Sequence, residues 1–174
     1  MKSVRSRLGL RVLGLATCIA TVAVGVTATS AAALNTRTYE ELKNANIHQY
    51  CLDMKAEDPA EGARAQLWNC TNTPEQKFIL VASDRGDGPV PGQWTIRSQS
   101  ARKCLWSAGP AGARVTQQAC YEYAQAQSWD LRPNGEIVNI YSGLCLDTVQ
   151  DKKGGAVVVA SCEGRIAQHW FHHL

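Results

Sequence analysis

The sequence predicts a closed all-β fold built from three copies of one unit. Three observations lead to this prediction: a threefold internal repeat, six cysteines spaced in step with it, and short β-rich runs bounded by turn residues. Beyond the first 33 residues, no stretch keeps the 3.6-residue apolar period of an amphipathic helix. Because one such unit cannot bury its apolar face alone, we expect the three units to share a single core.

Three matched features define the repeat. Each copy opens with Cys-Leu, carries a glycine eight residues before its second cysteine, and closes with a Gln-x-aromatic step. The openings are Cys51-Leu52-Asp53, Cys104-Leu105-Trp106 and Cys145-Leu146-Asp147; the glycines are Gly62, Gly112 and Gly154; the closing steps are Gln76-Lys77-Phe78, Gln127-Ser128-Trp129 and Gln168-His169-Trp170. The copies cover about residues 39–80, 93–130 and 135–174, and we expect their closing aromatic residues to lie in the shared core.

The cysteines follow the same period. Cys18 lies in the N-terminal leader, and the other six could pair in 15 ways. Their successive separations of 19, 34, 16, 25 and 17 residues alternate between short and long. Pairing in sequence order closes three loops of similar size, one inside each repeat, so we predict the disulfides Cys51–Cys70, Cys104–Cys120 and Cys145–Cys162.

Strands are predicted at residues 94–96, 137–141 and 156–160, which are β-rich and flanked by Gly, Ser, Asn or Pro. The first two repeats lie 53 residues apart, and the next two lie 41 apart. The excess falls around residues 84–92, a Gly/Pro-rich stretch that we expect to be an extended surface loop. Its Arg85-Gly86-Asp87 spells an integrin-type tripeptide, which we interpret as a chance match.

The first 33 residues are typical of a secretory signal peptide. Lys2, Arg5, Arg7 and Arg11 precede an apolar run, and Ala31-Ala32-Ala33 supplies small residues for cleavage. An uncleaved anchor or a lipoprotein at Cys18 are the alternatives, but the apolar run is short for a membrane span of roughly 20 residues. We therefore expect a secreted, extracellular domain at 34–174 with no membrane insertion after cleavage.

Removing the leader changes the charge of the chain. Four of its 18 Lys and Arg residues lie there, which leaves 14 against 15 Asp and Glu. A nucleic-acid-binding protein normally carries a basic face or stripe. The nearly neutral composition therefore argues against nucleic acid and anionic membranes as partners.

The Cys-Leu-Asp openings, the Gln-Leu-Trp-x-Cys stretch at residues 66–70 and the closing Gln-x-Trp steps together resemble the ricin-B-type lectin domain. The resemblance covers about residues 39–174. It implies a β-trefoil with pseudo-threefold symmetry, in which each repeat can hold a shallow pocket for a sugar. The implied function is a non-catalytic lectin module that recognises galactose-type or related glycans.

The resemblance places a carbohydrate site in the first repeat. Asp53 is its hydroxyl-binding carboxylate, Gln66 its polar neighbour, Trp68 its stacking ring and Gln76 its amide. A carboxylate accepts charge-assisted bonds from adjacent hydroxyls, and an aromatic ring covers the C–H face of the sugar. Glu75 stands where the family often has Asn, which removes a donor and adds charge.

The other two repeats depart further from the family pattern. In the second, Trp106, Thr116 and Gln118 replace the carboxylate, the polar residue and the ring, so we predict that this site is lost. The third retains Asp147 and Gln168, and we predict a weaker second site there. Val158 and Ala160 stand at the positions of Gln66 and Trp68, so it lacks an aromatic platform.

The sequence leaves other functions open. A degenerate trefoil scaffold, or a protein-binding inhibitor or toxin-targeting subunit, would carry the same repeats. An enzyme is not expected, because the chain has neither a G-x-S-x-G nor an H-E-x-x-H motif. No cofactor is expected, and no metal either: the chain lacks a Cys-x-x-Cys pair, and His169, His172 and His173 are interpreted as solvated. The identity of the sugar and the oligomeric state do not follow from the sequence.

Overall fold

The computed structural model describes residues 38–55, 59–84 and 88–171. The predicted signal peptide, the Arg-Gly-Asp tripeptide, His172 and His173 lie outside these residues. No helix in the described part of the chain has the length and apolar character needed to cross a membrane.

The described residues form short strands and single 3-10 turns. The strands are β1 (Glu40–Glu41), β2 (Lys43–Asn44), β3 (Tyr50–Met54), β4 (Ala65–Asn69), β5 (Lys77–Asp84), β6 (Pro89–Ser98), β7 (Cys104–Trp106), β8 (Thr116–Gln118), β9 (Ser128–Leu131), β10 (Ile137–Asn139), β11 (Cys145–Thr148), β12 (Val157–Ala160) and β13 (Trp170–Phe171). The turns are η2 (Pro74–Gln76), η3 (Gln125–Gln127) and η4 (Ile166–Gln168), one before the closing aromatic residue of each repeat. All pairings between these strands are antiparallel. The predicted strand at 94–96 lies within β6, whereas those at 137–141 and 156–160 are longer than β10 and β12, which they contain.

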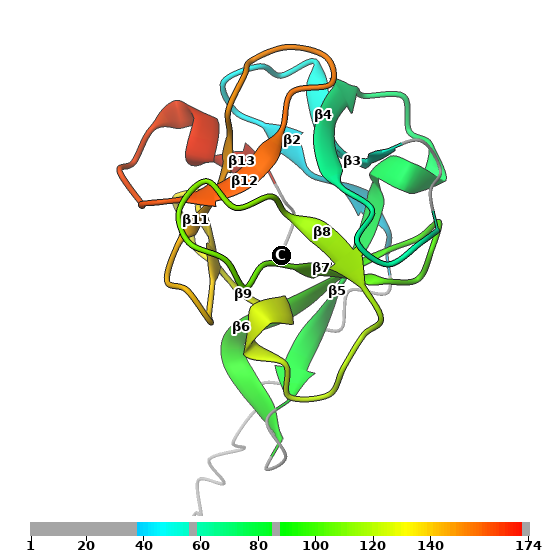
Figure 1. The fold of residues 1–174 in the computed structure, drawn as a ribbon, viewed down its shortest axis with the longest axis vertical. Coiled ribbons are helices and arrows are strands. Elements are labelled where there is room, and N and C mark those ends of the chain that lie inside the picture. The colour runs from blue at the N-terminus through cyan, green and yellow to red at the C-terminus, as the bar shows by residue number, and fades with distance from the viewer. Residues whose placement is uncertain (1–37, 56–58, 85–87, 172–174) are drawn as a thin grey trace, which may run out of the picture. The chain divides into compact units, whose positions relative to one another are not determined.

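Each repeat contributes one two-stranded hairpin, and the three hairpins meet at the centre of the fold (Figure 1). The hairpins are β3–β4, β7–β8 and β11–β12. Backbone hydrogen bonds join them in sequence: Ala65 N donates to Val115 O at 2.9 Å, and Val115 N donates to Val157 O at 3.1 Å. This threefold arrangement is the β-trefoil that the resemblance predicts.

The matched glycines have a structural reason. Gly62, Gly112 and Gly154 all adopt positive φ angles, of 82°, 88° and 77°. In that conformation the amide of each donates to a strand of another repeat, to Gln117 O, Val159 O and Leu67 O respectively. A residue with a Cβ is strained there, so glycine recurs at each junction.

The shared core is built from matched positions. Phe78, Trp129 and Trp170 are at most 1% exposed, as predicted for the closing aromatic residues. The leucines of the three Cys-Leu openings, Leu52, Leu105 and Leu146, are fully buried in the same cluster. Each of the three repeats is bridged inside itself, by Cys51–Cys70, Cys104–Cys120 and Cys145–Cys162, so the pairing in sequence order is found.

The stretch at residues 84–92 differs from its prediction as a loop. Most of it belongs to the long hairpin of β5 and β6, in which Asp84 pairs with Pro89 and Phe78 pairs with Ser98. The hairpin extends beyond the rest of the domain at the bottom of Figure 1. Pro can stand at the start of a strand, where no ladder donor is required, so the Gly/Pro content did not exclude a strand here.

Candidate functional site

A pocket of about 350 Å³ opens in the first repeat, beside the β3–β4 hairpin. The two strands pair in register, which sets Asp53 opposite Gln66 and Cys51 opposite Trp68. Side chains two residues apart on a strand share a face, so Gln66 and Trp68 project to the same side as Asp53. The lining residues are Asp53, Met54, Lys55, Gln66, Trp68, Thr71, Thr73 and Glu75.

The Asp53 carboxylate lies at the base of this pocket and is 6% exposed. Its Oδ1 accepts a hydrogen bond from Gln66 Nε2 at 2.8 Å, and its Oδ2 accepts one from Gln76 Nε2 at 3.2 Å. Burial raises the pKa of Asp53, and this effect is larger than the lowering by the two amide hydrogen bonds. The negative charge of Glu75 raises the pKa further. Two amides thus hold a poorly solvated carboxylate toward the pocket.

Gln76 lies behind Asp53 and does not line the pocket. It is fully buried, its Oε1 accepts from Thr71 N at 2.7 Å, and its Nε2 donates to Asn69 O at 2.7 Å. Gln127 and Gln168 make the same pair of backbone contacts in their own repeats. The recurring glutamine therefore closes the loop after each second cysteine, and Gln76 additionally orients Asp53.

Trp68 forms one wall of the pocket and is partly exposed. Lys153 Nζ lies 4.1 Å from the centroid of its ring. Lys153 is not among the residues that line the pocket, and its ammonium makes a cation–π contact with this ring. The loop that carries Lys153 is held by Gly154 N, which donates to Leu67 O at 2.7 Å. The third repeat therefore supports the aromatic wall of the first.

Four residues that line the pocket of the first repeat were not predicted from the sequence. Met54 and Lys55 follow Asp53 along the chain, and Thr71 and Thr73 lie in the loop after Cys70. None of them belongs to a feature shared by the three repeats, so the repeat pattern gave no signal for them. The loop positions could have been found only by noting that they lie between Cys70 and the η2 turn.

The second repeat has no carboxylate at the matched position. Trp106 lines a separate pocket of about 330 Å³ together with Ala108, Ala124, Gln125, Ala126 and Tyr141. Its walls are mostly apolar. The side chain of Gln127 donates to Ala119 O and accepts from Tyr121 N. The substitutions have therefore replaced the polar chemistry of the first repeat.

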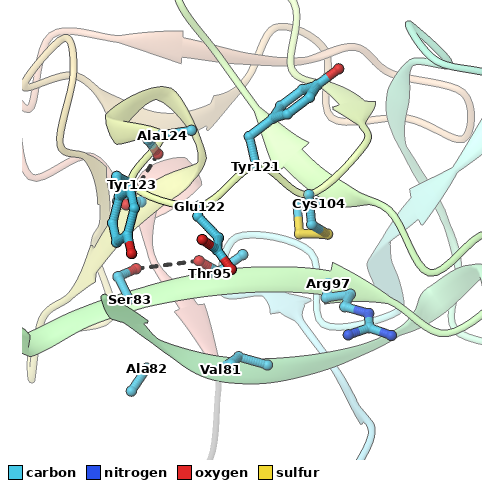
Figure 2. A pocket seen from close by; sticks show the side chains of 12 residues that line it. Val81, Ala82, Ser83, Thr95, Arg97, Cys104, Tyr121, Glu122, Tyr123 and Ala124 are labelled. Atoms are coloured by element: carbon cyan, nitrogen blue, oxygen red, sulfur yellow. Dashed lines mark hydrogen bonds between the residues drawn. A yellow bond between two sulfur atoms is a disulfide. The ribbon is translucent and has the colours of Figure 1, made fainter. Parts of the chain in front are cut away.

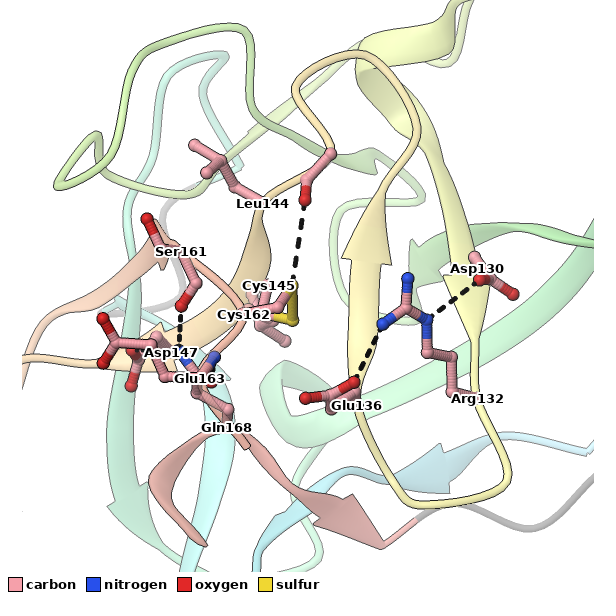
Figure 3. The surroundings of a disulfide bond; sticks show 12 residues. Asp130, Arg132, Glu136, Leu144, Cys145, Asp147, Ser161, Cys162, Glu163 and Gln168 are labelled. Atoms are coloured by element: carbon pink, nitrogen blue, oxygen red, sulfur yellow. Dashed lines mark hydrogen bonds and ion pairs between the residues drawn. A yellow bond between two sulfur atoms is a disulfide. The ribbon is translucent and has the colours of Figure 1, made fainter. Parts of the chain in front are cut away.

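In the third repeat, the carboxylate of Asp147 is bonded to other groups of the protein. Its Oδ2 accepts from Gln168 Nε2 at 2.9 Å and pairs with Arg165 Nη2, while its Oδ1 accepts from Thr148 N at 2.7 Å. Figure 3 shows Asp147 and Gln168 beside Ser161, around the third disulfide. Arg165 directly precedes η4, as Thr73 directly precedes η2. A guanidinium thus takes the place of a small hydroxyl and covers the carboxylate.

The described residues hold no group of three or more His, Cys, Asp or Glu side chains placed to bind a metal ion. The expectation that His169 is solvated is wrong. Its backbone bridges to Glu136 and its side chain is half-buried, with Nε2 shielded from solvent. Strand pairing near the chain end draws this residue into the fold.

Comparisons with known proteins agree with this structure. A model of the ricin-type beta-trefoil lectin domain matches residues 38–170. Polypeptide N-acetylgalactosaminyltransferase 9 of Homo sapiens is 33% identical over 80% of this chain, and beta-galactoside-specific lectin 2 of Viscum album is 30% identical over 60% of it. The aligned regions make up 23% and 17% of these relatives, so the chain spans less than a quarter of their length. The designed threefold-symmetric protein ThreeFoil superposes with a TM-score of 0.65 at 24% identity, covering 76% of this chain and 95% of that one. The chain therefore belongs to the ricin-type beta-trefoil lectin family.

Proposed function

We propose that this protein is a secreted, non-catalytic lectin that binds a galactose-type sugar in the pocket of its first repeat. The observation that carries the proposal is the placement of a held carboxylate, Asp53, and a partly exposed ring, Trp68, on one pocket. The second and third repeats lack this combination.

The geometry suits a sugar ring. Each carboxylate oxygen has two lone-pair sites, and the amides of Gln66 and Gln76 use one on each oxygen of Asp53. The remaining sites can accept hydrogen bonds from two adjacent hydroxyls. Trp68 can then stack on the C–H face of the ring and remove that apolar area from water.

Two relatives support the choice of a galactose-type ligand. One is named as a β-galactoside-specific lectin, and the other is named as an N-acetylgalactosaminyltransferase. The proposal of secretion rests on the predicted leader and on three disulfides, which persist in oxidising compartments. Asp147 does not line the pocket that holds Asp53, which supports a binding role over hydrolysis by this pair of carboxylates.

A glycan array probed with the exported, oxidised protein tests the proposal. We expect binding that free galactose or N-acetylgalactosamine competes, and that Trp68→Ala weakens about tenfold through the loss of stacking. Gln118→Ala is the matched control, because Gln118 holds the same position in the second repeat. Absence of binding from the folded protein, or equal binding by wild type and Trp68→Ala, would contradict the proposal and favour a scaffold or a protein partner.

As the pH is lowered, sugar binding is expected to weaken at a higher pH than the one at which an exposed aspartate gains its proton. The ionised form of Asp53 accepts the sugar hydroxyls, and its raised pKa means that it gains a proton at a higher pH. Folding has the opposite dependence: a carboxyl with a raised pKa contributes stability at low pH, which is lost as pH rises through the folded-state pKa. Calorimetric titration with the sugar across pH 3–7, beside thermal melts, separates the two effects.

Glu75→Gln provides the control for this pH dependence. Burial is the larger cause of the raised pKa of Asp53, and the charge of Glu75 adds to it. Removing that charge should move the acid limb of the binding profile to lower pH. A limb that coincides with the titration of an exposed aspartate in both proteins would contradict the assignment to Asp53.

A further inference from the structure

Another cavity lies where the β5–β6 hairpin meets the loop that follows Cys120 (Figure 2). Its volume is about 240 Å³, below the roughly 300–1,000 Å³ of sites for drug-sized ligands, so it suits a small molecule. It shares no residue with the Asp53 pocket. Trp106, Thr116 and Gln118, which stand at the matched sugar-site positions of the second repeat, do not line it either.

The hairpin wall of this cavity is polar. Ser83 is 3% exposed, and its Oγ lies 3.3 Å from Thr95 Oγ1. Arg97 also lines the cavity, and its Nε is buried with no hydrogen-bond partner among the described residues. Arg97 therefore adds a positive charge to this wall, while its Nε stays shielded from solvent.

The loop wall adds a carboxylate and an aromatic ring. Figure 2 shows Glu122 and Tyr123 pointing from the loop toward the strands that carry Ser83 and Thr95, whereas Tyr121 points away. Tyr123 is 54% exposed, and Glu122 forms no ion pair within the described part of the chain.

Tyr123 adopts an unfavourable backbone conformation for its residue type. Its φ is 63°, and the residues at the matched positions, two before each 3-10 turn, are Asn72 with φ 58° and Gly164 with φ 66°. Asn and Gly tolerate this left-handed region, but a bulky side chain rarely occupies it. Since strained residues concentrate at functional sites, the tyrosine points to a role for its ring in the cavity.

We propose that this cavity is a second carbohydrate site, which binds one neutral sugar unit. Glu122 accepts hydrogen bonds from sugar hydroxyls, the hydroxyls of Ser83 and Thr95 form the polar wall beside it, and the ring of Tyr123 packs on the C–H face. A carboxylate and a guanidinium of opposite charge leave the cavity nearly neutral, which favours an uncharged polyol over an anion or a cation. The inference rests on the proposed function only in that the ligand belongs to the same chemical class.

A second site changes how the protein meets a glycan surface. A single shallow site binds weakly, whereas two sites on one rigid chain raise the effective concentration of the second binding event. The β5–β6 hairpin, which accounts for the wider spacing between the first two repeats, supplies one wall of the added site.

Amide chemical shifts of the ¹⁵N-labelled, exported protein test the proposal residue by residue. Galactose, N-acetylgalactosamine, mannose and xylose are titrated separately. We expect at least one sugar to move the amides of residues 121–124 together with those of Ser83 and Thr95. Glu122→Gln should raise the dissociation constant obtained from these shifts about tenfold or more, because a charge-assisted acceptor is lost. Glu163→Gln, in the corresponding loop of the third repeat, should leave it unchanged.

The outcomes separate this site from the proposed function. In Asp53→Asn, the response at residues 121–124 should persist while that around Trp68 disappears. A response at residues 121–124 without one around Trp68 would overturn the proposed first site and support the second. Silence of residues 121–124 toward all four sugars, or an undiminished response in Glu122→Gln, would overturn the second site.

Discussion

Replacing Asp53 with asparagine is expected to weaken sugar binding by about tenfold to a hundredfold while leaving the fold intact. The substitution preserves shape but removes the charge that strengthens hydrogen bonds from sugar hydroxyls. It also sets an amide against the Nε2 groups of Gln66 and Gln76, which need acceptors. Because burial already disfavours the charged carboxylate, we expect the free energy of unfolding to change by no more than about 1 kcal/mol. Calorimetric titration and chemical denaturation measure the two quantities.

Asp147→Asn is the matched control for this experiment. Asp147 lies at the same position in the third repeat, but Arg165 and Gln168 already engage its carboxylate. We expect sugar binding to stay unchanged and stability to fall, because the guanidinium of Arg165 loses the buried one of its two carboxylate partners. If Asp147→Asn weakens binding as much as Asp53→Asn does, the third repeat holds the working site.

Trp129→Ala is expected to lower the free energy of unfolding by about 3–5 kcal/mol, the range for deleting a large buried aromatic side chain. Trp129 is fully buried, and its Nε1 donates to Leu105 O at 3.3 Å. The substitution leaves a cavity in the shared core and an unpaired carbonyl. Guanidinium denaturation with the disulfides intact measures the loss.

Two further variants serve as controls for the loss of stability in Trp129→Ala. Trp129→Phe should cost less, because Phe78 fills the matched core position of the first repeat. Val149→Ala should stay within about 0.5 kcal/mol of wild type, since Val149 is 61% exposed. A loss below about 1 kcal/mol in Trp129→Ala would contradict a core common to all three repeats.

The departure from threefold symmetry is the reason why we propose the sugar site in the first repeat. The glutamine of every repeat makes the same backbone bonds, so it survives in all three for structural reasons. The carboxylate position carries no such requirement. It has accordingly diverged to Trp106 in one repeat and to an ion-paired aspartate in another.

The sequence by itself determined the repeat, the disulfide pairing and the core. Cys-Leu openings, glycines and closing aromatic residues recur at fixed spacing, because each copy must bury the same face against the other two. The repeat also distinguishes Trp68 from the tryptophans of the core. Its counterparts Gln118 and Ala160 are not aromatic, so no shared packing position demands a ring.

Only the tertiary structure decided how the site is built. It placed Lys153 against the ring of Trp68 and Arg165 over Asp147, and it set Gln76 behind the carboxylate that it orients. It also made most of the residue 84–92 segment part of the β5–β6 hairpin, whose other residues line a further cavity. These contacts join side chains from different repeats or loops of irregular length. Repeat spacing specifies which residues are equivalent, whereas contacts between non-equivalent residues arise only when the chain closes on itself.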